Sequence, residues 1–293
     1  MTNGAAFLVV GGDSLVGGGV VDALSRRGHR AYSTTRKAET LNAERLYLDF
    51  ERYTEFNVPA DVGYAYLVAA ATSYDRCEND PLARVTNVEL IPAFVGSLLE
   101  RGKFVTFIST NTVFGGDRPW PDEDAPHDPR IAYAHQKAEG EAAIRAIATK
   151  IGAADRLAVV RLTKILAANV SPLPAWFAAW QRGVAVDPFA DLIFAPISRR
   201  FVGDALVALG EKRIAGNLHL SGAENVSYVD FALALAHRMG IDKSLIRPTT
   251  AVAKGVDIPF KPRFSGLGMT RTTQLSGIEP QRLEQVIGDL VPG

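Results

Sequence analysis

Short apolar segments alternate with helix-forming segments through the first half of the chain, and this alternation constrains the fold more than any other feature. Six segments have the apolar character of buried strands: 6–10, 30–35, 45–48, 64–69, 103–108 and 157–162. Helices are predicted among them at 15–27, 81–101 and 131–150. Because parallel strands are joined by crossover helices, this order predicts an α/β fold with a doubly wound parallel sheet and helices on both faces.

The composition of the chain changes after residue 162. Prolines and aromatic residues become frequent, which predicts a smaller and less regular lobe. Within this part we expect a strand at 217–220 and a helix at 228–239. The tail at 251–271 is rich in Gly, Pro and Arg, and we expect it to loop over a cleft.

Charge and cysteine content exclude several classes of protein. Basic and acidic residues number 32 each, so the formal net charge is zero and gives no support to a nucleic-acid partner. Cys77 is the single cysteine, which excludes an internal disulfide, and the five histidines form no metal-ligating motif. No export signal and no apolar stretch of membrane-spanning length is apparent. We therefore expect a cytoplasmic protein without a metal site or membrane contact.

The first predicted strand ends in a glycine-rich turn, G-G-D-S-L-V-G, that leads into the first helix. Gly11, Ser14 and Gly17 follow the three-residue spacing of a dinucleotide-binding turn, with serine in the middle position, and Leu15 and Val16 begin the helix. Glycines let the backbone approach a pyrophosphate, and the helix N-terminus offers free N–H groups and a positive dipole end. The alternative is a tight strand-to-helix connection that binds no ligand.

The end of the second predicted strand bears on which nicotinamide cofactor would bind. A site for NAD(H) usually has an acid there, whereas this stretch reads Ser33-Thr34-Thr35-Arg36-Lys37, with no acid before Glu39. Hydroxyls followed by two cations suit a 2′-phosphate, because a guanidinium can bind its oxygens in a fork. The sequence therefore favours NADP(H), with NAD(H) as the alternative. A solvated loop is the other interpretation of Arg36 and Lys37.

A tyrosine and a lysine lie four residues apart on the helix predicted at 131–150. Tyr133 and Lys137 therefore project from one helix face. A neighbouring cation stabilises a phenolate and lowers its pKa, which makes tyrosine a usable general acid or base. The strand at 103–108 runs into Ser109 and Thr110, whose hydroxyls would lie at the carboxyl edge of the sheet beside this pair. The alternative is a surface helix on which an aliphatic stem covers a ring.

Three stretches of the chain carry a family resemblance. They are V-G-G-D-S-L-V-G near the start, S-T-N-T-V-F-G-G followed by Y-A-H-Q-K-A-E-G-E, and the late K-P-R-F-S-G-L. The second is similar to S-T-D-Y-V-F-x-G and Y-G-x-x-K-x-x-G-E, and the third to R-P-x-x-S-x-L. The sequence thus resembles the extended short-chain dehydrogenase/reductases, and within them the sugar-nucleotide-binding group of dTDP-4-dehydrorhamnose reductases.

The resemblance implies a domain organisation and a set of site residues. It implies a Rossmann-type NAD(P)-binding domain over 1–164, with a return near 195–222, and a smaller substrate-binding lobe over 165–293. Thr110, Tyr133 and Lys137 match the catalytic residues. Those expected to bind the cofactor are Gly11, Ser14, Leu15, Val16, Gly17, Thr35, Arg36, Lys37, Asp49, Phe50, Ala69, Ala70, Ala71, Asn87, Ser109, Tyr133 and Lys137.

The chain departs from the family pattern at positions expected to face the sugar. Asn111 and Thr112 stand where the family has D-Y, and Thr163-Lys164 stands where the rhamnose reductases have a tryptophan after Arg161. We therefore expect a substrate other than dTDP-4-dehydrorhamnose. Lys164 either pairs with an anionic group of the substrate or faces solvent or cofactor.

Further candidates complete the expected substrate side. Thr72 and Thr112 align with substrate-facing positions. Arg263, in the flexible tail, is expected either to clamp a nucleotide diphosphate or to be solvated.

Other conspicuous residues have simpler interpretations. Asp122-Glu123-Asp124 is interpreted as a solvated loop in preference to an acid/base cluster. Trp176 and Trp180, four apart, are assigned to a buried face of the lobe in preference to a stacking platform for a ligand. His135 is assigned to the surface, because a residue two positions from Tyr133 does not share its helix face.

These features together predict an NAD(P)H-dependent reductase of a keto-sugar nucleotide, in which hydride passes to a 4-keto carbon. The first alternative is a nucleotide-sugar epimerase or dehydratase that retains its NAD(P). The second is a non-catalytic regulatory subunit that binds cofactor and a partner enzyme. The sequence leaves the oligomeric state open, with a homodimer as one option.

Overall fold

A seven-stranded parallel sheet forms the centre of the computed structural model, which describes residues 5–291. The strand order is β10-β6-β5-β4-β1-β2-β3. The strands are β1 (Ala6–Val10), β2 (Ala31–Thr35), β3 (Arg45–Tyr47), β4 (Val62–Leu67), β5 (Phe104–Thr110), β6 (Leu157–Leu162) and β10 (Gly216–Leu220). The α/β fold predicted from the sequence is confirmed. The six predicted strands of the first half and the strand expected at 217–220 are all present within two residues of their expected limits.

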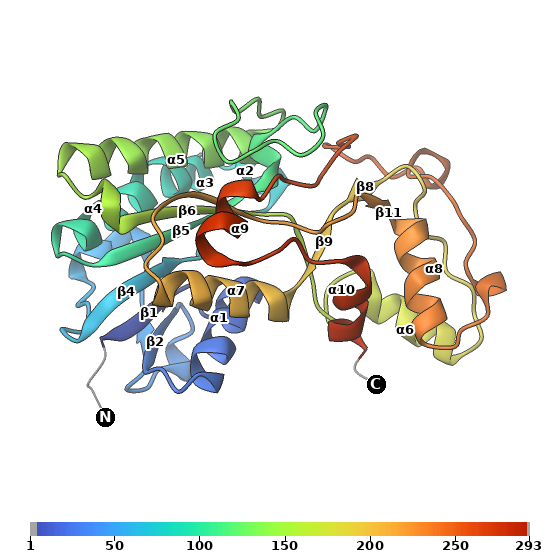
Figure 1. The fold of residues 1–293 in the computed structure, drawn as a ribbon, viewed down its shortest axis with the longest axis horizontal. Helices are drawn as coiled ribbons and strands as arrows, with labels where there is room; N and C mark the ends of the chain where they lie inside the picture. The colour runs from blue at the N-terminus through green and yellow to red at the C-terminus, as the bar shows by residue number, and fades with distance from the viewer. Residues whose placement is uncertain (1–4, 292–293) are drawn as a thin grey trace.

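Helices cover both faces of the sheet, as the apolar strand segments require (Figure 1). In β1, Phe7 and Val9 pack into one core cluster while Leu8 packs into the other. The first cluster lies under α1 (Leu15–Arg26) and α7 (Arg199–Glu211), and the second under α4 (Ile91–Glu100) and α5 (Ala132–Lys150). A strand buried on both faces has no polar alternation, which explains the continuous apolar run at the start of the chain.

Helix α7 was not predicted from the sequence, although it covers the sheet together with α1. The two helices approach closely, because a Cβ added at Gly203 would lie 2.3 Å from the carbonyl oxygen of Gly19. Val202 and Leu206 of α7 are fully buried against the sheet. The chain therefore returns to the first domain with a helix as well as with β10.

One helical segment, 81–100, is long and apolar enough to cross a membrane by length and composition alone. It consists of α3 (Pro81–Val85), a π-helical turn η3 (Thr86–Leu90) and α4. Half of it is buried, and Phe94 and Leu98 of α4 pack in the core beneath the sheet. It is therefore a core helix of the fold.

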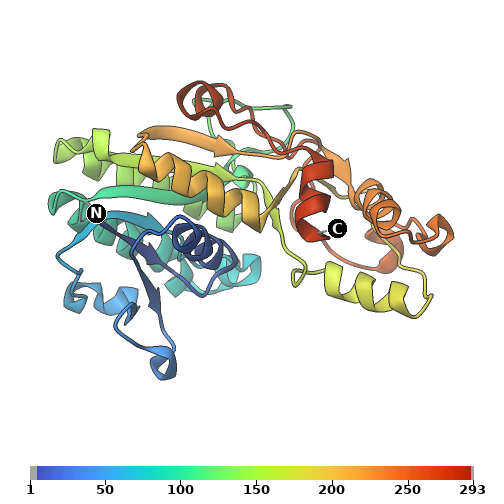
Figure 2. The same cartoon turned by 60° about the horizontal axis from the view of Figure 1, so that its bottom comes forward.

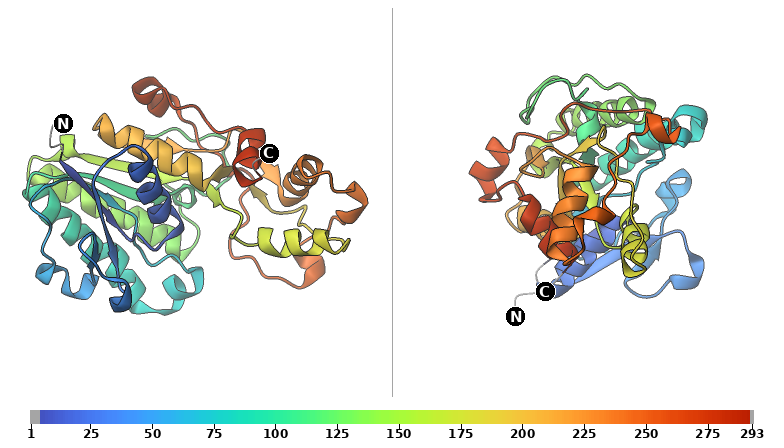
Figure 3. Two further views of the ribbon diagram at one scale, coloured as in Figure 1. Left: turned by 90° about the horizontal axis from the view of Figure 1, so that it is seen from below. Right: turned by 90° about the vertical axis from the view of Figure 1, so that its right-hand side faces the viewer.

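A smaller lobe lies at one end of the sheet domain (Figures 2 and 3). Its helices α6 (Leu173–Gln181), α8 (Tyr228–Arg238) and α10 (Leu283–Leu290) enclose a separate apolar cluster. Trp176 and Trp180 are buried in this cluster, as expected. The short strands β7 (Lys164–Leu166), β9 (Pro196–Ser198), β8 (Ile193–Phe194) and β11 (Val226–Ser227) form two small ladders beside it. The domain boundary at residue 164 stays a prediction.

Candidate active site

A cleft of about 670 Å³ opens where the carboxyl ends of the sheet strands meet the lobe. This edge is where open α/β sheets place their ligands. The sheet domain contributes the start of α1, the segments after β4 and β5, and one face of α5. The lobe and the tail contribute mainly apolar and aromatic side chains, among them Ile193, Phe194, Tyr228, Ile258 and Phe260.

The glycine-rich turn is shaped by two glycines that no other residue could replace without displacing backbone. Gly11 has a φ of +94°, and a Cβ there would lie 2.8 Å from the backbone nitrogen of Ala69. A Cβ at Gly17 would lie 2.1 Å from the carbonyl oxygen of Gly11. These close approaches bring the start of α1 against the ends of β1 and β4.

Ser14, in the place of the middle glycine, caps helix α1. Its hydroxyl accepts a hydrogen bond from Gly17 N at 3.0 Å and donates one to Gly11 O at 2.8 Å. Among the described residues, the backbone N–H groups of Leu15 and Val16 have no protein acceptor, and both residues line the cleft. Free N–H groups at the positive end of a helix are the donor set that a pyrophosphate requires, so the turn fits a dinucleotide.

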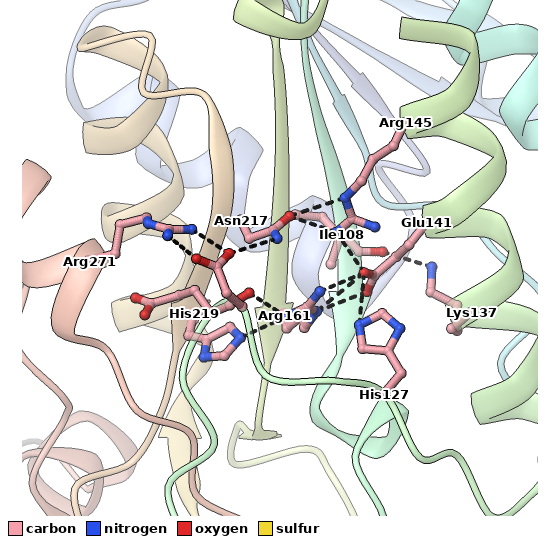
Figure 4. A network of polar contacts seen from close by, with 11 residues as sticks. Ile108, His127, Lys137, Glu141, Arg145, Arg161, Asn217, His219 and Arg271 are labelled. Carbon is pink, nitrogen blue, oxygen red and sulfur yellow. Dashed lines mark hydrogen bonds and ion pairs between the residues drawn. The ribbon is translucent and has the colours of Figure 1, made fainter. Parts of the chain in front are cut away.

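The three residues predicted to be catalytic, Thr110, Tyr133 and Lys137, line the same cleft as this turn. Lys137 is buried on α5, and its Nζ donates a hydrogen bond to Ile108 O at 2.8 Å (Figure 4). The ammonium also lies 3.9 Å from the ring centroid of Phe107. Burial lowers the pKa of Lys137 to about 8.

Tyr133 presents a protonated phenol to the cleft. Burial raises its pKa well above the usual value, with a further increase from Tyr74, whose ring centroid lies 5.5 Å away. The Thr110 hydroxyl acts in the opposite direction. In this structure the Lys137 ammonium donates to Ile108 O, and burial is the largest influence on the Tyr133 pKa, so a lowering of that pKa by Lys137 stays a prediction.

The hydroxyls after β5 differ in their surroundings. Thr110 Oγ1 accepts from Thr112 N at 3.2 Å and lies 3.1 Å from Thr112 Oγ1. Ser109 also lines the cleft, but its Oγ is buried and has no hydrogen-bond partner within residues 5–291. Of the two, Thr110 is the hydroxyl whose hydrogen bond acts on the Tyr133 phenol.

The residues expected beneath the cofactor ribose lie in a loop after β4 that is held by side-chain hydrogen bonds. Ala70 lines the cleft, and Ala69 packs against Gly11. The Asn87 amide is turned away from the cleft and binds both the N–H and the C=O of Ala71, at 3.0 and 2.9 Å. Asn87 thus holds the loop and does not line the cleft wall.

Asp49 and Phe50, expected to contact the adenine, lie outside the cleft after β3. Asp49 caps the short helix η2 (Phe50–Glu55) by accepting from Glu51 N at 3.2 Å. The Phe50 ring packs on Phe94, with centroids 5.9 Å apart. An adenine role for this pair stays a prediction.

The cationic segment after β2 is accompanied by a carboxylate that comes from elsewhere in the sequence. Arg36 and Lys37 are exposed, and neither forms an ion pair with a described residue. Thr35 is buried, accepts from Lys37 N at 3.0 Å and donates to Asp13 Oδ2 at 2.5 Å. Asp13 belongs to the glycine-rich turn and also pairs with Arg45.

The predicted substrate residues separate into two groups. Thr72, Thr112 and Lys164 line the cleft, and no carboxylate among the described residues lines it with them. Lys164 is exposed to solvent, and partial desolvation at the cleft lowers its pKa. Arg263 is exposed and is not part of the lining; its guanidinium carbon lies 5.2 Å from the ring centroid of Phe264.

Asn111, at the first departure from the family's D-Y, ties the segment after β5 to the tail. Its Nδ2 donates to the backbone oxygen and the hydroxyl of Ser265 at 2.9 and 3.0 Å. Pro262 and Ser265 line the cleft, so the tail does run along it as expected.

A buried polar network joins α5, β6 and β10 (Figure 4). Glu141, one turn after Lys137 on α5, pairs with Arg161 of β6 at 2.9 Å, and the two side chains are 0% and 2% exposed. Arg161 Nη1 also lies 3.1 Å from Nε2 of His219, whose Nδ1 lies 2.7 Å from Gly268 O. Because Nδ1 donates to that carbonyl, Nε2 is the acceptor for the guanidinium.

The acidic loop before α5 is only partly solvated. Asp122 and Asp124 are exposed, as expected, and Asp124 pairs with Arg271. The expectation is wrong for Glu123, which is 3% exposed and accepts from the N–H and hydroxyl of Thr272 at 2.8 and 3.0 Å. His135 is exposed, as expected.

The sheet, the glycine-rich turn at its first strand and the Tyr–Lys helix beside it define an extended short-chain dehydrogenase/reductase. Within this class, the chain belongs to the RmlD substrate binding domain family, whose model matches residues 5–292. No curated protein matches the chain.

Solved structures share the fold at low sequence identity. A dTDP-4-dehydrorhamnose reductase from Bacillus anthracis str. Ames, in complex with NADP, has a TM-score of 0.80 at 18% identity, covering 98% of this chain and 97% of that one. A UDP-N-acetylglucosamine 4-epimerase from Methanobrevibacter ruminantium M1, in complex with UDP-N-acetylmuramic acid, has a TM-score of 0.78 at 16% identity, covering 98% of both chains. A dTDP-glucose 4,6-dehydratase from B. anthracis str. Ames, in complex with NAD, has a TM-score of 0.77 at 15% identity, covering 98% and 95%.

Proposed function

We propose that the protein is an NAD(P)H-dependent reductase of a keto-sugar nucleotide. The observation that carries the proposal is that Thr110, Tyr133 and Lys137 line one cleft with the start of α1. A free N-terminal turn of a helix binds the pyrophosphate of a dinucleotide, and the three side chains supply the polar groups that carbonyl reduction requires.

Each residue has a distinct part in this chemistry. When bound, the reduced nicotinamide supplies a hydride to the carbonyl carbon of the substrate. Thr110 donates a hydrogen bond to the carbonyl oxygen, and Tyr133, whose raised pKa keeps it protonated, gives its proton to the oxygen as negative charge develops there. Lys137 keeps donors free beside its bond to Ile108 O, and these would bind the ribose hydroxyls and draw closer to the phenol.

The walls of the cleft support an anionic substrate that also carries an apolar face. Lys137 and Lys164 are the cations that line it, and no carboxylate of the described residues opposes them. Phe194 and Tyr228, whose ring centroids are 4.3 Å apart, offer aromatic surface on the lobe side. A nucleotide sugar has both features, and one solved structure of this fold holds UDP-N-acetylmuramic acid.

Lys164 is the residue that we expect to select an acidic sugar in place of dTDP-4-dehydrorhamnose. The variant Lys164→Met should raise the KM for the true substrate without changing the melting temperature. Unchanged kinetics would eliminate a contact between Lys164 and an anionic group. The same comparison with Arg263→Met tests whether the tail arginine reaches the diphosphate.

A direct assay tests the reductase function. The purified protein is mixed with NADPH or NADH and a panel of 4-keto nucleotide sugars, and the absorbance of the reduced cofactor is followed. We expect loss of absorbance in proportion to the alcohol formed.

Turnover without net cofactor consumption would instead indicate an epimerase or dehydratase, the activity named for two of the structures that share the fold. No turnover with any substrate, together with cofactor binding, would indicate the regulatory subunit.

The proposal includes a cytoplasmic location and a substrate-binding role for 165–293. For the cofactor, exposed Arg36 and Lys37 support NADP(H), and Asp13 beside Thr35 opposes it.

A further inference from the structure

Asp13 brings a carboxylate from the glycine-rich turn to the end of β2. Its Oδ2 accepts a hydrogen bond from Thr35 Oγ1 at 2.5 Å, and its Oδ1 pairs with the guanidinium of Arg45 on β3. The contact depends on the adjacent parallel pairing of β1 with β2 and of β2 with β3. The carboxylate therefore lies across the carboxyl ends of the first three strands.

This position is chemically significant in a dinucleotide site. The group at the end of the second strand reads the 2′ position of the adenosine ribose: a carboxylate accepts from a 2′-hydroxyl, and an arginine accommodates a 2′-phosphate. In this chain the end of β2 has no acid of its own, since it reads Thr35-Arg36-Lys37. Asp13 supplies the missing carboxylate from the neighbouring turn, where the sequence pattern alone gives no reason to look for it.

The groups around Asp13 keep its carboxyl ionised, and the carboxylate in turn pairs with one of the nearby cations. The hydrogen bond from Thr35, with the charges of Arg45 and Lys37, lowers the pKa of Asp13, so it is an anion at neutral pH. Arg45 is held between Asp13 and Thr40, whose Oγ1 accepts from Arg45 Nε at 3.0 Å. A 2′-phosphate would have to displace this pair or bind beside an uncompensated carboxylate.

We propose that Asp13 determines the cofactor choice of this protein and turns it toward NADH, against the preference that Arg36 and Lys37 alone would give. Its carboxylate accepts a hydrogen bond from the ribose 2′-hydroxyl and repels a 2′-phosphate, while Arg45 is kept on the carboxylate. The inference rests on the nicotinamide cofactor of the proposed function.

The test measures the dissociation constants of NADH and NADPH by titration calorimetry, so it requires no knowledge of the substrate. We expect the wild-type protein to bind NADH more tightly. Asp13→Asn should shift the ratio of the two constants toward NADPH by about tenfold or more, because it removes one negative charge within contact distance of the phosphate. Arg45→Gln should shift the ratio the other way, because it removes a cation and leaves Asp13 unpaired.

Asp22→Asn is the matched control, because Asp22 lies on α1, carries the same charge and pairs with Arg199 at 2.7 Å. It should leave the ratio unchanged. A structural effect would weaken the binding of both cofactors alike, whereas recognition shifts the ratio of the dissociation constants in opposite directions in the two test variants. If Asp13→Asn does not fold, Arg45→Gln alone tests the inference.

Two results overturn the inference: tighter NADPH binding by the wild type, or an unchanged ratio in folded Asp13→Asn. If the wild type binds neither cofactor, the proposed function fails as well, and that outcome is distinct from an unchanged ratio.

Discussion

Removal of the Glu141 carboxylate should destabilise the protein far more than removal of a surface carboxylate on the same helix. In Glu141→Gln, the partners that the buried Arg161 guanidinium keeps among residues 5–291 are Glu123 O and His219 Nε2, both at 3.1 Å, beside a neutral amide. Breaking one side of a buried ion pair costs about 3–5 kcal/mol, because the remaining charge is left uncompensated.

The pKa of Glu141 gives an independent magnitude. The charges of Arg161 and Arg145 and the hydrogen bonds from Arg161 outweigh its burial and hold the pKa at about 2, against an ordinary 4.5. A carboxyl with that change stabilises the fold by about 3 kcal/mol at neutral pH. Since the folded-state pKa is lowered, this stability is fully present above pH 4.5 and is lost as the pH falls toward 2.

Urea unfolding followed by circular dichroism measures the difference between wild type and variant. Glu139→Gln is the control: Glu139 lies two residues away on α5 and pairs with Arg84 at 2.6 Å, but the two side chains are 42% and 53% exposed. An exposed pair contributes about 1 kcal/mol or less. If Glu141→Gln lowers the free energy of unfolding no more than Glu139→Gln does, the buried network does not stabilise the fold as argued.

Three further predictions concern the site and the network. Tyr133→Phe should lower kcat by at least about 100-fold while the cofactor dissociation constant stays unchanged; retained turnover would remove Tyr133 from the proton transfer. Gly11→Ala should abolish cofactor binding, because the new Cβ would lie 2.8 Å from Ala69 at a φ of +94°. Its control Gly28→Ala, at a φ of +71° with no heavy atom within 4 Å, should cost only about 1 kcal/mol and leave binding intact. His219 has a pKa lowered to about 4 by burial and by the charge of Arg161. As the pH falls, His219 is therefore protonated in the unfolded chain before it is protonated in the folded protein. The free energy of unfolding should decrease by about 2 kcal/mol between about pH 7 and about pH 5. Urea denaturation at the two pH values should show a smaller loss of unfolding free energy in His219→Gln than in the wild type. An equal loss in both would contradict the assignment of the pH dependence to His219.

The parts of the fold that depend on local pattern were predictable. The continuous apolar run of β1 and the long helix α5 appear where the sequence places them. Helix α7 was missed although Ser198 caps it and Val202 and Leu206 have helical spacing, because nearby prolines and aromatic residues suggested an irregular lobe.

The parts of the site that depend on contacts distant in sequence were not predictable. The role of Asn87 follows from hydrogen bonds to the backbone of Ala71, 16 residues away, which no local side-chain pattern encodes. Asp13 meets Thr35 only because β1 and β2 are neighbours in the sheet. Glu123 meets Thr272 across 149 positions of the sequence, so its burial could not be inferred from an acidic loop.

The returning segments have a consequence for how the chain can be divided. Strand β10 pairs with β6, and α7 covers the sheet beside α1, so a fragment that stops at residue 164 would expose an edge strand and an apolar sheet face. It would also deprive Arg161 of His219. During synthesis the first domain can therefore complete its own interior only after the chain has been made as far as the end of β10 at Leu220, and expression of the two halves as separate polypeptides should yield an aggregating first half.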